Sequence, residues 1–503
     1  MKVNQLSGGA ILSLAAIVVG SCIQIIYTPI FLRYLGPANY GINSFVEALI
    51  GYIGMMSLGF ETTMLRYTVQ YRVSPEKEKI PYLNGLFFLI FLSLGVISFI
   101  TGIIIYLKLG DFLSKSFTLE QILVSKKVFL LLLIKVAISF PIMLFSTYIL
   151  SKEKFIFAKL ISLINIIVNP LIGIVLVVNG FGLIEIALGT VFCTIIFGIL
   201  NCYYACKLGI EIKIGNFNKM LVKELVIFTL FIFMNVLIDR LYWNTDKILL
   251  SKYIGPISVG IYSVANLFIT VYINFSTAIS SVLSPRINTL VAEQKNKELS
   301  EMFIKVGRIQ FLLLGLILTG FIILGKDFIY LWIGENVIEI YHIVLIIMIP
   351  LTIPLCQNTG IIILQAKNLH GFRSIVYLII ALLNVLLSLV LVKKYGTIGC
   401  AIGTGVSYIL GAGIIINIYY SKKANLEIGE FWKQIIKMLI PMMLLLLFGT
   451  IINNNVLHVI TWGNFIKKGV IFSGMYGIMT YLFLFNKYEK TVVKKITKTF
   501  FRI

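Results

Sequence analysis

Charged side chains are scarce in this sequence. Only 13% of the 503 residues are charged, whereas 59% are hydrophobic, and the mean hydropathy is +0.98. A soluble globular protein carries about 25% charged residues, because it has to cover a water-facing surface. The shortage excludes a cytosolic enzyme, a secreted domain and a disordered chain. It predicts a membrane protein that crosses the bilayer many times.

The chain also has few of the residue types that form most catalytic and metal sites. The chain has three histidines and six cysteines, and no two cysteines form a C-x-x-C pair. Cys202 and Cys206 lie one helical turn apart without histidine or carboxylate beside them, so we expect structural thiols and no metal. A glycan polymerase, glycosyltransferase or acyltransferase would need a large outer loop or a catalytic cluster. The longest outer segment, about 108–127, is short, and no Asp-x-Asp occurs. We therefore expect neither an enzyme nor a cofactor.

Long apolar runs dominate what remains. A bilayer-spanning helix needs about 20 mainly apolar residues. Runs of that kind predict an all-α polytopic membrane protein with about fourteen transmembrane helices, near residues 8–32, 41–64, 81–107, 128–150, 156–178, 183–206, 224–250, 257–284, 303–325, 340–364, 373–392, 397–420, 434–452 and 465–486. The first run is too long for a cleaved signal peptide and leads directly into the second.

The net charge is +22, but the Lys and Arg residues lie between apolar runs and not on a soluble domain, so the charge does not indicate nucleic-acid binding. With the N-terminus inside, 29 Lys and Arg residues fall in inner segments and 11 in outer segments. This asymmetry predicts a protein of the cytoplasmic membrane with both termini cytoplasmic. The basic tail at 487–503 is expected to lie on anionic membrane lipid.

Two pairs of segments repeat along the chain. At an offset of 219 residues, Gly-Pro is followed four residues later by a second glycine, in Gly36-Pro37…Gly41 and Gly255-Pro256…Gly260. At an offset of 214 residues, Gly182, Ala187, Gly189 and Thr190 match Gly396, Ala401, Gly403 and Thr404. Gly-Pro ends a helix, because proline disfavours the α region in the residue before it and glycine tolerates turn geometry. A plain helical hairpin would also explain one such element, but not the duplication.

The duplication predicts a domain organisation. Two six-helix lobes, 1–215 and 216–425, are followed by two additional transmembrane helices within 426–486 and by the tail. Because each lobe crosses the membrane an even number of times, the repeats have the same orientation. We expect an axis along the membrane normal and a pathway between the lobes.

Four segments carry a family resemblance. They are F-L-R-Y-L-G-P-A-N-Y-G at 31–41, D-K-I-L-L-S-K-Y-I-G-P-I-S-V-G-I-Y-S-V-A at 246–265, S-P-R at 284–286 and K-Y-G-T-I-G-C-A-I-G-T at 394–404. Together they resemble the polysaccharide transporter branch of the MATE-like exporter superfamily for multidrug, oligosaccharidyl-lipid and polysaccharide substrates. The resemblance implies two six-helix lobes around a central cavity and an oligosaccharide-lipid flippase, similar to O-antigen or capsule flippases.

The predicted helix at 224–250 holds the densest group of intramembrane charges: Asp239, Arg240, Asp246 and Lys247. Such charges are costly in a bilayer and are functional candidates by default. None has an opposite charge three or four residues away, so we expect partners elsewhere. Arg240, Trp243, Asn244 and Lys247 share one helical face, where cations and an aromatic ring suit a diphosphate and a sugar. Alternatively, Asp246 and Lys247 only snorkel from the end of the span.

The repeat offset adds three residues to this candidate cavity. Glu47 corresponds to Asn266, and Gln24 corresponds to Trp243, so we expect all of them to face the same central space. Asp246, Asp239 and Glu47 are the candidates for cation coupling.

These inferences predict a flippase that moves polyprenyl-diphosphate-linked oligosaccharide units outward by alternating access, with a glycan polymerase or glycosyltransferase as possible partner. Two alternatives stay open at this point. One is a cation-coupled multidrug exporter of the same superfamily, which typically has twelve helices. The other is a flippase for lipid-linked peptidoglycan precursor, which the same architecture would accept.

Overall fold

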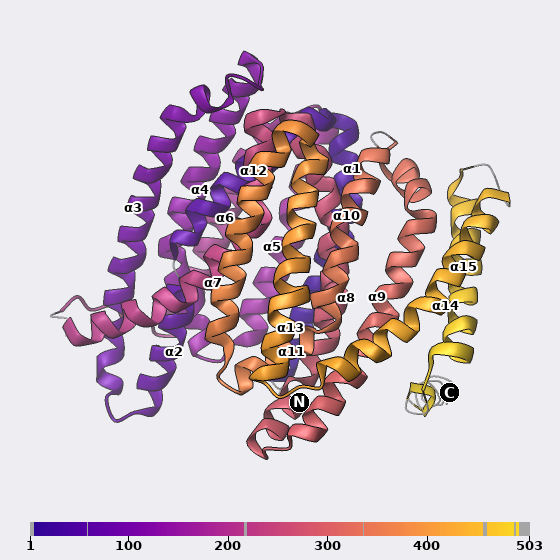
Figure 1. Cartoon of the computed structure of the whole chain (residues 1–503). Helices are drawn as coiled ribbons and strands as arrows, with labels where there is room; N and C mark the ends of the chain where they lie inside the picture. The colour runs from indigo at the N-terminus through magenta and orange to yellow at the C-terminus, as the bar shows by residue number, and fades with distance from the viewer. Residues whose placement is uncertain are drawn as a thin grey trace, which may run out of the picture. The chain divides into compact units, whose positions relative to one another are not determined.

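The computed structural model describes residues 5–57, 59–215, 219–334, 337–455, 460–486 and 489–491. They form two compact units, Met1–Ser263 and Val264–Ile503. Each unit is built from long helices (Figure 1). Helix α8, Pro256–Ala292, begins in unit 1 and ends in unit 2.

Unit 1 contains the first seven α-helices and two short 3₁₀ turns. The order is α1 (Gln5–Gly54), η1 (Met55–Ser57), α2 (Phe60–Val73), η2 (Lys77–Lys79), α3 (Ile80–Leu113), α4 (Leu119–Ser151), α5 (Phe155–Val178), α6 (Leu183–Lys207) and α7 (Lys219–Tyr253). The helix α4 packs along both α3 and α6, and α1 packs along α5 and α7. Helices α2, α3 and α4 together bury an aromatic core that includes Phe60, Phe87, Phe91 and Phe140.

Unit 2 contains the end of α8 and the following elements. They are α9 (Asn296–Ile333), α10 (Val337–Cys356), α11 (Asn358–Ala366), α12 (His370–Tyr408), the π-helical turn η3 (Ile409–Ile415), α13 (Ile416–Lys422), α14 (Ile428–Asn455), α15 (Trp462–Met479) and the π-helical turn η4 (Thr480–Leu484). Helix α9 packs against α10, α14 and α15.

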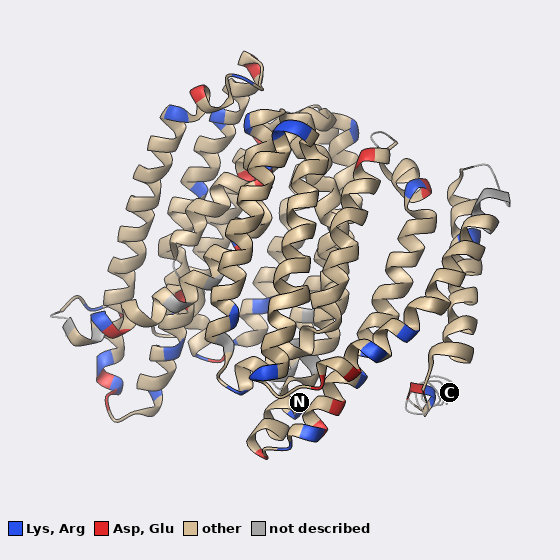
Figure 2. Cartoon of the chain, in the orientation of Figure 1, with Lys and Arg blue, Asp and Glu red and all other residues tan. Residues whose placement is uncertain are grey.

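The helices have the lengths and surfaces of membrane spans. Eleven helical stretches of the described residues are long and apolar enough to cross a bilayer. Two of these stretches, Ile11–Val73 and Gly371–Lys422, contain a non-helical glycine, Gly36 and Gly396, and so hold more than one helix each. Charged residues are found mainly toward helix ends, whereas helix centres are mostly uncharged (Figure 2). The chain is an all-α, multi-pass membrane protein, and the count of fourteen spans stays a prediction.

The repeated Gly-Pro elements end helices as predicted. Gly36 has φ +78° and separates the two arms of α1, and Gly255 has φ +134° and separates α7 from α8. A side chain is strained at such φ values, whereas glycine is not. Proline follows at the first position of the next helix, where its missing N–H costs no hydrogen bond.

The second glycine of each element permits a close helix crossing inside unit 1. A Cβ atom on Gly41 would lie 1.7 Å from the carbonyl oxygen of Pro256 and 3.0 Å from the nitrogen of Gly260. A Cβ atom on Gly260 would lie 2.7 Å from the carbonyl oxygen of Pro37. The two repeated elements therefore pack directly on each other, backbone against backbone.

Several predicted helix bounds were wrong, and three of them have a clear local cause. The run at 41–64 is interrupted by Gly59, whose φ is +81°, so α2 is a separate helix. The run at 340–364 breaks at Gln357, three residues after Pro354, and continues as α11. The run at 128–150 begins earlier, because Thr118 and Gln121 form a capping box that starts α4 at residue 119. The expected outer segment at 108–127 is therefore mostly helical.

The predicted division into 1–215, 216–425 and 426–486 stays a prediction. The predicted tail at 487–503 lies outside the described residues apart from 489–491.

Candidate functional site

Helix α7 is held against the second arm of α1 by polar contacts. The Tyr52 hydroxyl donates to the carbonyl oxygen of Arg240 at 3.0 Å and shares a hydrogen bond with the Thr245 hydroxyl. One residue earlier, Gly51 has no side chain, and a Cβ there would lie 3.3 Å from both Arg240 Nη1 and Asn244 Nδ2. The guanidinium and the amide therefore lie side by side over the backbone of α1.

An opposite charge lies one turn earlier on α1. Glu47 is exposed, and its Oε1 accepts a hydrogen bond from Asn43 Nδ2 at 3.0 Å. It is close enough to the half-buried Lys247 for its charge to act on the ammonium. Asn43, Glu47 and Gly51 are spaced by four residues and share one face of α1. This face and the Arg240–Lys247 face of α7 together form a charged cluster within unit 1.

The two aspartates of α7 have different surroundings. Asp239 is exposed, whereas Asp246 is only 2% exposed and accepts a hydrogen bond from the Tyr262 hydroxyl of α8 at 2.6 Å. A buried carboxylate of this kind is held inside the protein rather than extended toward the membrane surface. Trp243 is half-buried, and its ring lies 5.7 Å from that of Tyr242.

The structure brings together only part of the predicted set. Arg240 and Asn244 lie together over Gly51, and Glu47 and Lys247 lie on the two helix faces that form the charged cluster. Gln24 is exposed and lines a separate groove between the first arm of α1 and α5. Asn266 is half-buried and belongs to unit 2.

Sequence reasoning missed three residues that build the cluster: Asn43, Gly51 and Tyr52. They carry no charge, so a search for intramembrane ions passes over them. The spacing of four residues around Glu47 is the signal that would have found the first two.

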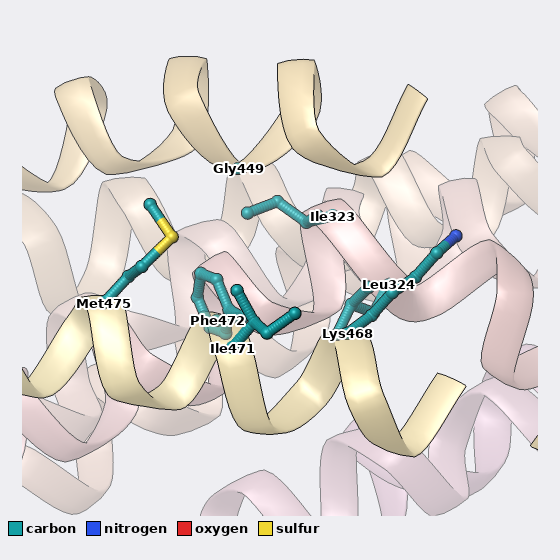
Figure 3. Close-up of a pocket in the computed structure, with 7 residues that line it drawn as sticks. All are labelled: Ile323, Leu324, Gly449, Lys468, Ile471, Phe472 and Met475. Atoms are coloured by element: carbon teal, nitrogen blue, oxygen red, sulfur yellow. The ribbon is translucent and has the colours of Figure 1, made fainter. Parts of the chain in front are cut away.

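Unit 2 has buried ion pairs of its own. Lys468 Nζ on α15 lies 2.9 Å from Asp327 Oδ2 on α9, and both side chains are largely buried. Lys468 borders a small cavity whose other lining residues are apolar or glycine, among them Ile323 of α9, Gly449 of α14 and Phe472 of α15 (Figure 3). A larger groove of about 270 Å³ between α9 and α15 has no charged side chain in its lining. Its walls are mostly apolar and offer no cation to a phosphate.

Helices of transmembrane length, with a charged cluster between two of them, define a polytopic membrane protein of the transporter class. Solved structures share the fold. The lipid II flippase MurJ, in its inward closed conformation, aligns with a TM-score of 0.75 at 19% identity over 94% of this chain and 98% of that chain. An inward-facing multidrug MATE transporter of the MOP superfamily aligns with a TM-score of 0.66 at 14% identity over 82% and 96%.

Sequence relatives point in the same direction. A protein of Shigella flexneri named as an O-antigen transporter is 23% identical over 77% of this chain and 91% of its own length. A protein of Haloferax volcanii named as the flippase AglR is 24% identical over 49% of this chain and 51% of its own length. The family described as polysaccharide biosynthesis protein matches residues 6–291, more than half of the chain. The chain belongs to this family.

Proposed function

We propose that this protein is a flippase that moves polyprenyl-diphosphate-linked oligosaccharide units from the inner to the outer leaflet of the cytoplasmic membrane. The charged cluster carries the proposal. Arg240 and Lys247 are two cations on one face of α7, and Asn244 lies between them over Gly51. Guanidinium and ammonium groups are the usual partners of phosphate oxygens. The family and the names of the relatives support a glycan cargo.

The physical problem is desolvation. Sugar hydroxyls and a diphosphate lose many hydrogen bonds in hydrocarbon, so they do not cross a bilayer unaided. A cavity with cations and amides replaces those bonds while the polyprenyl chain stays in the membrane. Alternating access of two lobes then exposes the cavity to each side in turn.

Two sources of energy fit this scheme. An inside-negative potential favours the outward movement of two negative charges by about 4–5 kcal/mol per 100 mV. Alternatively, a cation is coupled through Asp239, Asp246 or Glu47. The exposed position of Glu47 beside Lys247 supports a role close to the cargo, and the buried contact of Asp246 with Tyr262 supports a role inside the protein.

The same proposal includes orientation and partners. The excess of Lys and Arg in the predicted inner segments supports cytoplasmic termini. The protein carries out no covalent chemistry in this scheme. Glycosyltransferases that make the lipid-linked unit and a polymerase that consumes it are its functional neighbours.

The proposal is tested in a strain that lacks this gene. Lipid-linked glycan is expected to accumulate on the inner leaflet, with surface polysaccharide lost in parallel. Polyprenyl-linked oligosaccharide is assayed by membrane side, and surface glycan is quantified beside it. Unchanged glycan with altered sensitivity to drugs or dyes would instead identify a multidrug exporter. Accumulation of lipid-linked peptidoglycan precursor would identify that cargo.

Arg240→Glu is expected to abolish glycan export in the complemented strain, because a carboxylate at this position repels the diphosphate. Export is measured as surface polysaccharide at matched protein level in the membrane. Arg33→Glu, a charge reversal on an exposed side chain of the first arm of α1, serves as the control and is expected to retain export. Normal surface glycan with Arg240→Glu would remove Arg240 from the site.

A further inference from the structure

Unit 1 has a second polar surface, on the face between α1 and α5. It is a groove of about 290 Å³ that is open to the outside of the unit. Three carboxamide side chains lie in its lining, together with Gly20, Ile23, Ile166 and Pro170: Gln24 from α1 and Asn165 and Asn169 from α5. We call this the amide groove. Amides are rare in apolar helices because an unpaired amide is costly in hydrocarbon, so three in one groove call for an explanation.

The amides leave hydrogen-bonding capacity unused. Asn169 Nδ2 donates to Asn165 Oδ1, whereas Asn169 Oδ1 is buried and accepts no hydrogen bond within the described part of the chain. The side chain of Gln24 has no hydrogen bond to the residues that the structure describes. Each carboxamide has two donors and an acceptor oxygen. A ligand that both donates and accepts would satisfy these groups, whichever way each amide is turned.

The groove has a further acceptor in its wall. Pro170 has no N–H, so the carbonyl oxygen of Ile166, four residues earlier, lacks its usual helical donor. Ile166 itself lines the groove. The two helices are in ordinary van der Waals contact here, since a Cβ atom on Gly20 would lie 3.5 Å from Ile166 Cγ2.

The lining chemistry selects the ligand. The groove has no Lys or Arg for a phosphate and no carboxylate for a cation. Neutral amides instead match neutral hydroxyls, which donate and accept in equal measure. Of the parts of the proposed cargo, this lining suits the sugar rather than the diphosphate.

The contact between α1 and α5 continues beside the amide groove. Tyr27 lies one turn after Gln24 on α1, and its hydroxyl is 3.4 Å from the position of a Cβ on Gly173, one turn after Asn169 on α5. The groove and the charged cluster both belong to unit 1.

We propose that the amide groove, formed by Gln24, Asn165 and Asn169, binds sugar hydroxyls of the lipid-linked glycan while the charged cluster holds its diphosphate. The proposal rests on the flippase function. It adds a division of labour in which the groove recognises the glycan and the cluster recognises the part common to all polyprenyl diphosphates.

The test compares two ligands on the purified protein in detergent. One is the lipid-linked glycan extracted from the deletion strain, and the other is undecaprenyl diphosphate without sugar. Asn165→Leu/Asn169→Leu is expected to weaken binding of the glycan-bearing lipid by about tenfold, the effect of about two lost hydrogen bonds. Binding of undecaprenyl diphosphate is expected to stay within about twofold of wild type, since no amide of the groove is assigned to the diphosphate.

Two further variants make the result decisive. Gln24→Leu changes an exposed side chain, so it tests the groove without disturbing the α1–α5 packing. It is expected to weaken binding of the glycan-bearing lipid but not of undecaprenyl diphosphate. Asn179→Leu, at the exposed end of α5, is the matched control and is expected to bind both ligands normally.

Three outcomes would overturn the proposal or its foundation. Wild-type affinity for both ligands in all groove variants removes the groove from recognition. Equal loss of both ligands assigns the amides a structural role only. If the deletion strain accumulates no lipid-linked glycan, the flippase function itself fails, independently of the groove.

Discussion

Gly41→Val is expected to destabilise the protein by about 3 kcal/mol and to abolish glycan export. The reason is a contact between main chains. A Cβ at residue 41 would lie 1.7 Å from the Pro256 carbonyl oxygen, and no rotamer change relieves an overlap with backbone. Either α1 or the start of α8 has to move. The measurement is the apparent unfolding temperature of the purified protein, with surface glycan as the functional readout.

Gly54→Val is the matched control for this prediction. Gly54 ends the same helix, and a Cβ there meets no heavy atom within 4 Å. It is expected to remain folded and active. A Gly41→Val protein with the stability and activity of wild type would show that α1 and α8 do not cross at this distance.

Glu489→Ala is expected to destabilise unit 2 by about 3–5 kcal/mol, because it leaves a buried arginine without its counter-charge. Arg308 of α9 donates from Nε to Glu489 Oε1 at 2.7 Å and from Nη2 to Glu489 Oε2 at 2.9 Å. A third bond runs from Nη2 to the carbonyl oxygen of Leu484 at 2.8 Å. The Arg308 and Glu489 side chains are 9% and 4% exposed. Thermal unfolding of the purified variant measures the effect.

The same helix supplies a control ion pair. Lys305 and Glu301 on α9 lie 3.1 Å apart but are both exposed, so Glu301→Ala is expected to cost less than about 1 kcal/mol. The double variant Arg308→Met/Glu489→Met should recover most of the lost stability, since it removes the unpaired charge as well as the pair. If Glu489→Ala and Glu301→Ala have equal, small effects, the buried pair does not form.

Class and local breaks follow from composition and backbone rules. An apolar chain of this length has to lie in lipid. It forms helices there because every main-chain polar group needs a hydrogen-bond partner within the protein. Gly36 and Gly255 end helices because of local dihedral preferences, which do not depend on tertiary contacts. Predicted helix bounds were wrong where a short-range signal was overlooked. Gly59 interrupts the run predicted at 41–64, and the capping box at Thr118 starts α4 before the predicted residue 128.

The candidate site was only partly predictable. Charges on α7 are visible in the sequence because ions are rare in apolar runs. Their neighbours are not, because Tyr52 and Gly51 acquire their roles only when α1 lies against α7. The repeat offset paired Gln24 with Trp243, yet Gln24 lines a groove with α5, since packing rather than sequence register selects the face a side chain occupies.

The sequence by itself determined that this protein is helical and spans a membrane. It also determined that the helices end at the repeated Gly-Pro elements and that α7 carries charges. These are properties of single residues and of their periodicity along one helix. Only the tertiary structure decided that Gly41 and Gly260 pack backbone to backbone, that Glu47 lies near Lys247, and that Asn165 and Asn169 share a groove with Gln24. Those relations join residues far apart in the chain, and the close packing of helix faces is what brings them together.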